Sequence, residues 1–430
     1  MTVHASAHAA GRAADRSPRR APKSAPASAP ASAADLPAAD YYDVESLLNG
    51  RERAKLAELR DFLAAEVAPH AQGWWDREEF PFALVPKLGA LRLSAFHRPL
   101  PDRPAYSRLF QGLVIAELTR ADTSIATFFM VHHDLFVEGL YEFGTPEQRE
   151  RYLADATALR ATGAFALPQP EHGSDVAGGL SLLARRDGDH WVLDGAKRWI
   201  GNGTFADHLL VWARDVSDPG IPAGSRPVRC FIVAGESPGL TRTKIEHKIA
   251  LRTVQNANLA FDGVRVAEAD RFPGVATFDD ARTMLLSSRL LVAWQAVGQQ
   301  LAAFDVARQY AVERLQFGQP IASFQLIQGQ LTQMLGNATA SMALLAQLAR
   351  LQDAGQATMP RVALAKAWAT ARMRETVALG RGILGGNGIV TDYRMAKIFA
   401  DAEAVYTYEG TFEVNTLIAG RDITGVSAIR

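Results

Sequence analysis

The spacing of apolar residues divides the chain into three stretches. Between about residues 44 and 160, apolar positions recur every three to four residues, which predicts amphipathic helices. One run, residues 123–144 (TSIATFFMVHHDLFVEGLYEFG), is apolar almost all round and predicts a buried helix. The next predicted helix begins with Thr145 as N-cap and Pro146 in its first turn.

The period changes between about residues 162 and 275. Apolar runs become short and rich in β-branched and aromatic residues, and Gly, Pro and Asp separate them. Residues 191–203 (WVLDGAKRWIGNG), 208–215 (HLLVWARD) and 228–235 (VRCFIVAG) are examples. This pattern predicts an antiparallel β-domain of the sandwich or barrel type.

Long helices return after about residue 276. Residues 287–316 and 323–352 are two runs of about 30 residues with helical periodicity. One apolar stripe of the second run contains Phe324, Ile327, Leu331, Met334, Ala338, Met342, Leu345 and Leu348. With residues 361–384 and a short C-terminal helix, these runs predict a four-helix bundle.

The predicted fold is therefore mainly α with a central β-domain. We expect a disordered leader over residues 1–40 and an N-terminal helical domain over 41–161. A middle β-domain over 162–275 and a C-terminal helical bundle over 276–430 follow. The leader is rich in Ala, Pro and Ser, and so few large apolar residues do not offset the entropy lost on ordering.

Composition excludes several classes of function. The 46 basic and 46 acidic residues balance, so no nucleic-acid footprint or membrane-surface charge is indicated. No apolar run reaches about 18 residues, so no membrane span is predicted. The single cysteine, Cys230, lies in a strand-like run and is interpreted as a core residue. The sequence contains no HExxH motif, so it does not indicate a metal site of that kind. The leader lacks a secretory signal and the chain ends without a peroxisomal address, so we expect a cytoplasmic protein.

Glu409 is an isolated carboxylate between two tyrosines and a Gly-Thr pair, in YTYEGTFEVN (406–415). No Lys or Arg stands at helical salt-bridge spacing from it. An acid in a partly apolar site makes a better general base, whereas a helix N-terminal acid is the plainer interpretation. The Gly-rich run 382–392 (GILGGNGIVTD) lacks the glycine spacing of a dinucleotide-binding loop. It is either a backbone segment that a ligand can approach closely or a helix C-cap turn.

Five motifs together resemble the acyl-CoA dehydrogenase superfamily. They are PQPEHGSD (168–175), GAKRWIGNGTFADHLLVWAR (195–214), ERLQFGQPIASFQLIQGQL (313–331), LGGNGIVTDY (384–393) and YTYEGTFEVNTLIAGRDITG (406–425). The resemblance covers about residues 45–430 and is closest to the glutaryl-CoA dehydrogenase branch. Three stretches also look like the plant peroxisomal short-chain acyl-CoA oxidases of that branch.

The resemblance implies α,β-dehydrogenation of an acyl-CoA thioester, with Glu409 as the α-proton base and hydride transfer to N5 of FAD. In the family the thioester carbonyl is polarised by the glutamate's own backbone N–H and by a flavin ribityl hydroxyl. Two branches carry the base on the first long helix of the bundle, where this chain has Ser288, which cannot serve. Residues matching substrate contacts are Ser174, Arg289, Tyr408 and Gly410; a solvated helix arginine is the alternative for Arg289.

The resemblance also implies an FAD site. The matching cofactor-binding residues are Phe165, Leu167, Gly173, Ser174, Trp199, Gly385, Gly386 and Thr411, and, toward the FAD of a neighbouring subunit, Arg314, Phe317 and Gln325. A sandwich-core aromatic is the alternative for Trp199. A shared site implies a homo-oligomer, most often a tetramer in the family.

The chain departs from the family pattern at three places. Pro168-Gln169 stands where Thr-Glu is usual, and Gly201 replaces a Thr or Ser, so two hydroxyls near the flavin are absent. Ala126 stands where glutaryl-CoA enzymes carry an arginine for the distal carboxylate, which disfavours a dicarboxylyl substrate. We expect a dehydrogenase of fatty-acid β-oxidation that uses an electron-transferring flavoprotein. An oxidase using oxygen and a non-catalytic flavoprotein are the alternatives.

Overall fold

The computed structural model of the 430-residue chain describes residues 36, 38–100 and 103–428. Every helix and strand of the described part belongs to one compact unit, residues 37–430. The expected disorder of the leader falls, for residues 1–35 and 37, outside the described residues. Its last residues already belong to the fold: Ala39 is buried, and the Asp40 carboxylate accepts hydrogen bonds from the N–H groups of Val44 and Glu45.

Helices build the first part of the fold. They are η2 (Val44–Leu47), α1 (Gly50–Phe62), η3 (Leu63–Val67), α2 (Ala71–Arg77), α3 (Leu84–Ala90), α4 (Arg108–Ala121), α5 (Thr123–Met130), η4 (Val131–Val137), α6 (Glu138–Phe143) and α7 (Pro146–Thr157). Helix α7 begins as predicted, since the Thr145 side chain accepts from the Gln148 N–H and Pro146 is its first residue. The run 123–144 is helical and every residue of α5 is buried, which confirms the predicted buried helix.

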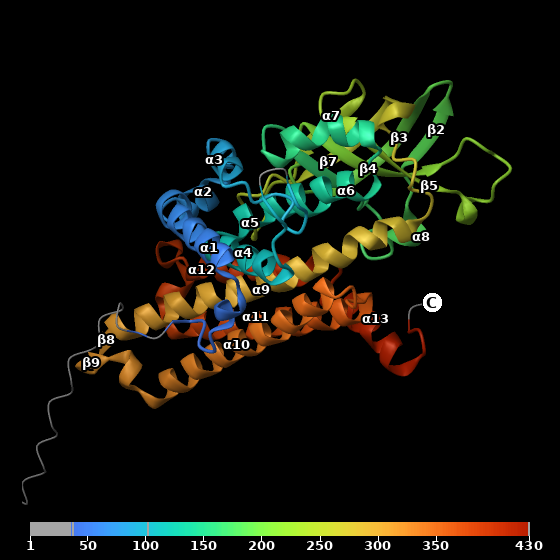
Figure 1. Ribbon diagram of the computed structural model, residues 1–430. Helices are drawn as coiled ribbons and strands as arrows, with labels where there is room; N and C mark the ends of the chain where they lie inside the picture. Colours follow the sequence, from blue (N-terminus) through green and yellow to red (C-terminus); the bar gives the residue numbers. More distant parts are fainter. Residues whose placement is uncertain (1–35, 37, 101–102, 429–430) are drawn as a thin grey trace, which may run out of the picture. The chain divides into compact units, whose positions relative to one another are not determined.

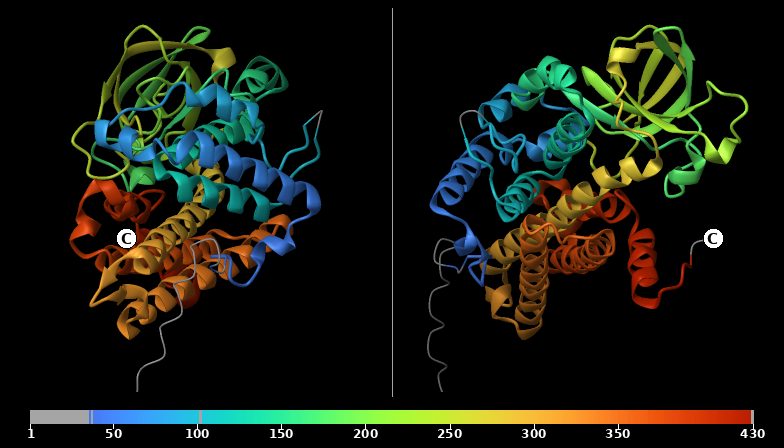
Figure 2. Two further views of the ribbon diagram at one scale, coloured as in Figure 1. Left: turned by 90° about the vertical axis from the view of Figure 1, so that its left-hand side faces the viewer. Right: turned by 45° about the vertical axis from the view of Figure 1, so that its right-hand side comes forward.

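The middle part of the chain forms one seven-stranded sheet, which lies at one end of the long helices (Figure 1). Its strands are β1 (Gly163–Ala166), β2 (Leu183–Asp187), β3 (His190–Ile200), β4 (His208–Asp215), β5 (Val228–Ala234), β6 (Leu240–Lys244) and β7 (Ala257–Ala267), in the order β1-β4-β2-β3-β7-β6, with β5 on β4. Short helices α8 (Val176–Gly179), η5 (Ala223–Ser225) and η6 (Glu268–Asp270) lie in its connections. The sheet curls like an open barrel (Figure 2), and the predicted middle β-domain is confirmed.

The sheet is not antiparallel throughout. Four pairings are antiparallel, including β3 with β7, where Trp191 stands opposite Val266. Strand β4, however, runs parallel to β1 and, at its end, parallel to β2. A parallel pair needs a long crossover, and the residues between β1 and β4 supply it. The loop from 167 to 182, which begins at the end of β1, reaches the large cavity of the molecule.

The last part of the fold is a bundle around α11 (Met359–Ile383), which contacts α9 (Phe278–Glu313), α10 (Gln325–Asp353), α12 (Met395–Thr407) and α13 (Phe412–Thr424). Strands β8 (Leu315–Gln316) and β9 (Gln319–Pro320) and the short helices η7 (Ile321–Ser323), η8 (Gly385–Ile389) and η9 (Thr391–Tyr393) connect them. The predicted stripe of α10 is buried from Met334 onward and packs partly buried at its start. The fold class is confirmed, but the C-terminal stretch also differs from the prediction: it is two helices, α12 and α13, and Glu409 lies in the break between them.

Candidate active site

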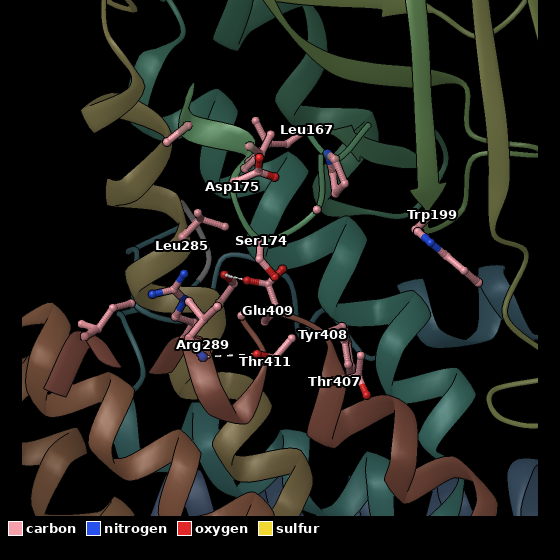
Figure 3. A pocket seen from close by; sticks show the side chains of 18 of the residues that line it. Leu167, Ser174, Asp175, Trp199, Leu285, Arg289, Thr407, Tyr408, Glu409 and Thr411 are labelled. Carbon is pink, nitrogen blue, oxygen red and sulfur yellow. Dashed lines mark hydrogen bonds between the residues drawn. The ribbon is translucent and has the colours of Figure 1, made fainter. Parts of the chain in front are cut away.

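A cavity of about 1730 Å³ opens where the β-domain meets the helices. Its walls come from the loop after β1, the end of β3, helix α9 and the α12–α13 segment (Figure 3). Ten predicted site residues line it: Phe165, Leu167, Gly173, Ser174, Trp199, Arg289, Tyr408, Glu409, Gly410 and Thr411. These residues are far apart in the sequence, and the fold brings them together.

Glu409 sits on a turn that its own backbone makes unusual. Its φ is 55° and that of Gly410 is 76°, both in the left-handed region that few L-residues adopt. A Cβ on Gly410 would also lie 3.0 Å from the side chain of Asn415 and 3.3 Å from Arg289, so glycine is required there. Helix α13 starts only at Phe412, with Thr411 as its N-cap, so Glu409 precedes the cap and is not a first-turn acid.

The Glu409 carboxylate faces the cavity with a neutral partner. The Ser288 hydroxyl, on buried helix α9, donates to Glu409 Oε2 at 2.7 Å. Two other carboxylates of the cavity wall are paired with basic side chains: Glu403 with Arg374 at 2.9 Å, and Asp175 with His172 at 2.8 Å. No ion pair among the described residues involves Glu409, so its carboxylate is able to accept a proton from a bound molecule.

Tyr408 closes one side of the Glu409 turn. Its hydroxyl donates to Gln295 Oε1 on α9 and lies 3.4 Å from the Thr127 hydroxyl on α5. Burial raises the pKa of Tyr408, so the phenol stays protonated. These contacts fix the ring against two helices and keep it beside the Glu409 carboxylate.

Arg289 is buried, with only 8% of its surface exposed, so the solvated-arginine interpretation is wrong. Burial lowers the pKa of its guanidinium, and the neighbouring Glu409 charge opposes that shift. Its Nη1 lies 3.0 Å from the Met359 sulfur, and its Nε has no hydrogen-bond partner among the described residues. A buried guanidinium with unused hydrogen-bond donors can bind a polar group of a ligand.

The β-domain supplies the opposite wall. Phe165 and Leu167 are buried at the end of β1, and Gly173 and Ser174 are exposed on the following loop. Trp199, at the end of β3, has a φ of 64° and is 52% exposed on the cavity (Figure 3), so its interpretation as a sandwich-core residue is wrong. A large aromatic side chain that stays exposed, on a residue with a strained backbone conformation, indicates a surface that a planar ligand covers.

Gln169 and Gly201, two departures from the family pattern, lie in or beside this wall and have packing or hydrogen-bond neighbours. The Gln169 amide donates to Gly179 O at 2.7 Å, and its oxygen accepts from the Leu182 N–H at 2.7 Å. Gln169 therefore ties together both ends of the loop that carries Gly173 and Ser174. Gly201 does not leave an open space, because a Cβ there would lie 2.9 Å from the Val131 side chain.

The remaining predicted residues lie outside the cavity wall. Arg314, Phe317, Gln325, Gly385 and Gly386 are all exposed, around the β8–β9 hairpin, the start of α10 and the end of α11. Phe317 is 92% exposed with a φ of 52°. Gly385 also has a positive φ, 58°, directly after α11, which agrees with a helix-ending turn at this place.

Sequence reasoning missed two buried residues that shape the site. Lys366 on α11 contacts the backbone of the Glu409 turn, and Asn415 on α13 bonds the carbonyls of Gly410 and Thr411. The signal for Lys366 was a lone lysine in the small, apolar run ALAKAWATA (363–371). A charge on a face that otherwise packs into the core needs a buried partner.

The chain matches three family models in sequence order. They describe the acyl-CoA dehydrogenase N-terminal domain over residues 50–159, the middle domain over 164–264 and the C-terminal domain over 278–424. The chain belongs to the acyl-CoA dehydrogenase family. It is an oxidoreductase of the flavoprotein class.

Individual relatives agree with this assignment. The mitochondrial short-chain specific acyl-CoA dehydrogenase of Bos taurus is 34% identical over 84% of this chain and 86% of its own length. Glutaryl-CoA dehydrogenase from Mycobacterium smegmatis has the same fold, with a TM-score of 0.86 and 33% identity, over 92% of this chain and all of that one. A second structure of a glutaryl-CoA dehydrogenase from that organism, in complex with FADH2, gives a TM-score of 0.85 at 30% identity over 90% and 98% of the two chains.

FAD is the cofactor of this chain, and the cavity fits it. The half-exposed Trp199 offers an aromatic face, and a Cβ on Gly173 would meet nothing within 4 Å. The volume of about 1730 Å³ is larger than that of most small-ligand pockets, as expected for a cofactor and a thioester side by side. No helix in the described part of the chain has the length and apolarity to cross a membrane.

Proposed function

We propose that this enzyme dehydrogenates a neutral acyl-CoA thioester between its α- and β-carbons to give the trans-2-enoyl-CoA. The observation that carries the proposal is the Glu409 carboxylate, which opens into the cavity and has, among the described residues, the Ser288 hydroxyl as its hydrogen-bond partner. FAD, when bound, supplies the acceptor for the hydride of the β-carbon. The protein must hold the substrate, remove the α-proton and stabilise the charge that develops on the thioester oxygen.

Glu409 is the proposed base. It takes the α-proton onto its carboxylate as the α-carbon electrons move toward the thioester carbonyl. The Ser288 hydroxyl donates to Glu409 Oε2, which orients the carboxylate. Tyr408 and Thr411 flank it in the cavity wall and help to exclude water from the acid.

The proposed donor to the thioester oxygen within this chain is the Glu409 N–H. Among the described residues no hydrogen bond uses this N–H. Gly410 allows the close approach of substrate to this backbone, because a side chain there would meet Asn415 and Arg289. Arg289 and Ser174, from opposite walls, are the proposed polar contacts of the rest of the thioester ligand.

The substrate class follows from helix α5. Ala126 is fully buried in the core, and the residues of this region that reach the cavity are Thr127, Met130 and Val131. None of these three carries a positive charge that could pair with a distal carboxylate, so the cost of desolvating that carboxylate would not be offset by an ion pair. A neutral short or medium acyl chain, straight or branched, is therefore the proposed substrate.

An electron-transferring flavoprotein is the proposed acceptor. The likeness of three motifs to plant oxidases favours oxygen instead, on the argument that Gly201 leaves room near the flavin. Val131 occupies that room, since a Cβ on residue 201 would lie 2.9 Å from it. This contact supports the dehydrogenase.

A homo-oligomer, with a tetramer as the expected form, is proposed from the exposed group around the β8–β9 hairpin. Three kinds of side chain are exposed together on the surface of the bundle: the guanidinium of Arg314, the aromatic ring of Phe317 and the amide of Gln325. A guanidinium pairs well with a pyrophosphate. We expect Arg314→Ala to weaken FAD retention on dilution by about tenfold or more, whereas Arg350→Ala, at another exposed arginine of the bundle, leaves it unchanged.

One anaerobic experiment tests the proposed function. The purified yellow enzyme is mixed with a panel of acyl-CoA thioesters that includes glutaryl-CoA, and bleaching of the flavin is followed. We expect bleaching with neutral acyl chains at rates about tenfold or more above that with glutaryl-CoA. Air is then admitted: a reduced flavin that persists until an acceptor is added supports the dehydrogenase, and reoxidation at the turnover rate with stoichiometric hydrogen peroxide contradicts it. No bleaching with any thioester contradicts the proposed reaction.

A further inference from the structure

Lys366 lies on α11 directly behind the Glu409 turn. Its side chain is fully buried, and its Nζ donates to three backbone carbonyls, those of Gly410 at 2.6 Å, Tyr408 at 2.8 Å and Tyr406 at 3.3 Å. Three acceptors match the three hydrogens of an ammonium group. All three hydrogen bonds of the lysine therefore go to the segment that carries the proposed base.

Burying this lysine is costly. The pKa of Lys366 is lowered to about 7, mainly by desolvation and to a smaller extent by the charge of Arg289, while the charges of Glu409 and Glu413 oppose the shift. An apolar side chain of similar size would avoid that cost, because it would bring no charge into the core. The role of Lys366 at the turn therefore depends on its charge and its hydrogen bonds, which an apolar residue does not have.

The contact with the Tyr408 carbonyl is the informative one. The carbonyl of Tyr408 and the N–H of Glu409 are the two ends of one peptide group. A hydrogen bond from a cation to the carbonyl end draws electrons toward the oxygen and makes the N–H end a stronger donor. Preorganised donors aimed at developing negative charge are a major source of rate enhancement in acyl chemistry.

We propose that Lys366 is a positioning residue that polarises the Tyr408–Glu409 peptide group and so strengthens the Glu409 N–H as a donor to the thioester oxygen. The proposal rests on the proposed function of Glu409 and deepens it. Lys366 does not touch the substrate. It acts through a single peptide group, and the left-handed backbone at Glu409 places carboxylate and N–H on the same short turn.

Asn415 provides an internal control for a purely structural role. Its side-chain amide donates to Gly410 O at 2.7 Å and to Thr411 O at 3.0 Å, so it also holds the turn, from helix α13. It makes no bond to the Tyr408 carbonyl, for which Lys366 is the hydrogen-bond donor among the described residues. Loosening the turn and depolarising the peptide group can therefore be separated by two variants.

The experiment compares Lys366→Met and Asn415→Ala with the wild-type holoenzyme. The enoyl-CoA product, labelled with ¹³C at its thioester carbonyl, is bound to each oxidised enzyme, and the carbonyl stretch is measured by difference infrared spectroscopy. We expect the wild-type enzyme to lower this frequency, Lys366→Met to lose about half or more of that shift, and Asn415→Ala to keep it. In turnover, Lys366→Met should lose about tenfold or more in kcat with KM changed by less than about threefold.

Equal carbonyl shifts in the wild type and Lys366→Met, with kcat within about twofold, overturn the proposal. Equal loss of shift in Lys366→Met and Asn415→Ala also overturns it, since the lysine would then only hold the turn. If Lys366→Met fails to retain FAD, Lys366→Gln, which keeps an amide donor, is measured instead: a shift smaller than wild type supports the proposal and an unchanged one contradicts it. Failure of the proposed function is a different result, namely a wild-type enzyme that no acyl-CoA bleaches.

Discussion

Two adjacent serines of helix α9 donate hydrogen bonds to two carboxylates in very different surroundings. Ser288 donates to Glu409 Oε2 at 2.7 Å in the large cavity, and Ser287 donates to Asp134 Oδ1 at 3.0 Å on another side of the helix. Asp134 lies on η4 and lines a second pocket of about 250 Å³. The local hydrogen-bond donor is the same in both places, so differences between the two acids come from their surroundings.

Access separates the two carboxylates. Asp134 is completely buried and its Oδ2 has no hydrogen-bond partner among the described residues. Burial, followed by the charge of nearby Glu138, raises the pKa of Asp134 to about 8. Glu409 is half-buried and faces a cavity about seven times larger, with room for a cofactor and substrate. A perturbed acid alone does not make a catalytic base; a perturbed or isolated acid with space in front of it does.

The largest expected effect is that of Glu409→Gln. This variant should keep FAD and bind acyl-CoA, because glutamine preserves the shape and can still accept from Ser288, but turnover should fall by several orders of magnitude. Anaerobic bleaching of the flavin in a stopped-flow instrument measures it. Asp134→Asn is the matched control and should keep most of the activity. A Glu409→Gln enzyme with more than about a tenth of wild-type kcat would show that the base is elsewhere.

Asp134 should instead control stability as a function of pH. Its native pKa, about 8, lies above the unfolded value of 3.8, so between these values the native state binds more protons than the unfolded state. The contribution is complete below about pH 4 and is lost as pH rises through about 8, by at most about 1.4 kcal/mol per pH unit.

Asparagine resembles the protonated acid, so Asp134→Asn should remove this slope. Urea unfolding of the wild type and the variant at pH 5 and pH 9 measures the effect. We expect the variant to gain stability relative to wild type at pH 9 by roughly 1 to 4 kcal/mol. Parallel pH dependences in the two proteins would contradict a protonated Asp134.

The smallest expected effects come from the serines themselves. Ser288→Ala removes the hydrogen bond that orients Glu409, and the rate of flavin reduction should fall by about threefold to thirtyfold, which corresponds to about 0.7 to 2 kcal/mol and lies within the net contributions of single hydrogen bonds. Ser287→Ala should leave that rate within about twofold, because its bond goes to Asp134. Single-turnover rates of both variants provide the test. Equal losses would mean that α9 affects both sites through its own packing.

Much of the fold follows from short-range patterns. The apolar periods predicted the order of helices, sheet and bundle, and the Thr145–Pro146 pair predicted the start of α7. The motif likeness picked out ten residues that line one cavity, and it gave the hypothesis that Glu409 is the base. The parallel pairing of β4 with β1 and β2 was not predicted, because alternation along a strand does not reveal the direction of its neighbours.

By itself, the sequence determined the helices, the strands, the family and the isolated acid, because periodicity, caps and motifs act over a few residues along the chain. Only the tertiary structure decided what surrounds that acid. Ser288 and Glu409 are 121 positions apart, and Lys366 and Tyr408 are 42 apart, so no local pattern records either contact. The left-handed turn at Glu409 and the buried ammonium behind it exist because α9, α11 and α13 pack around the same few residues.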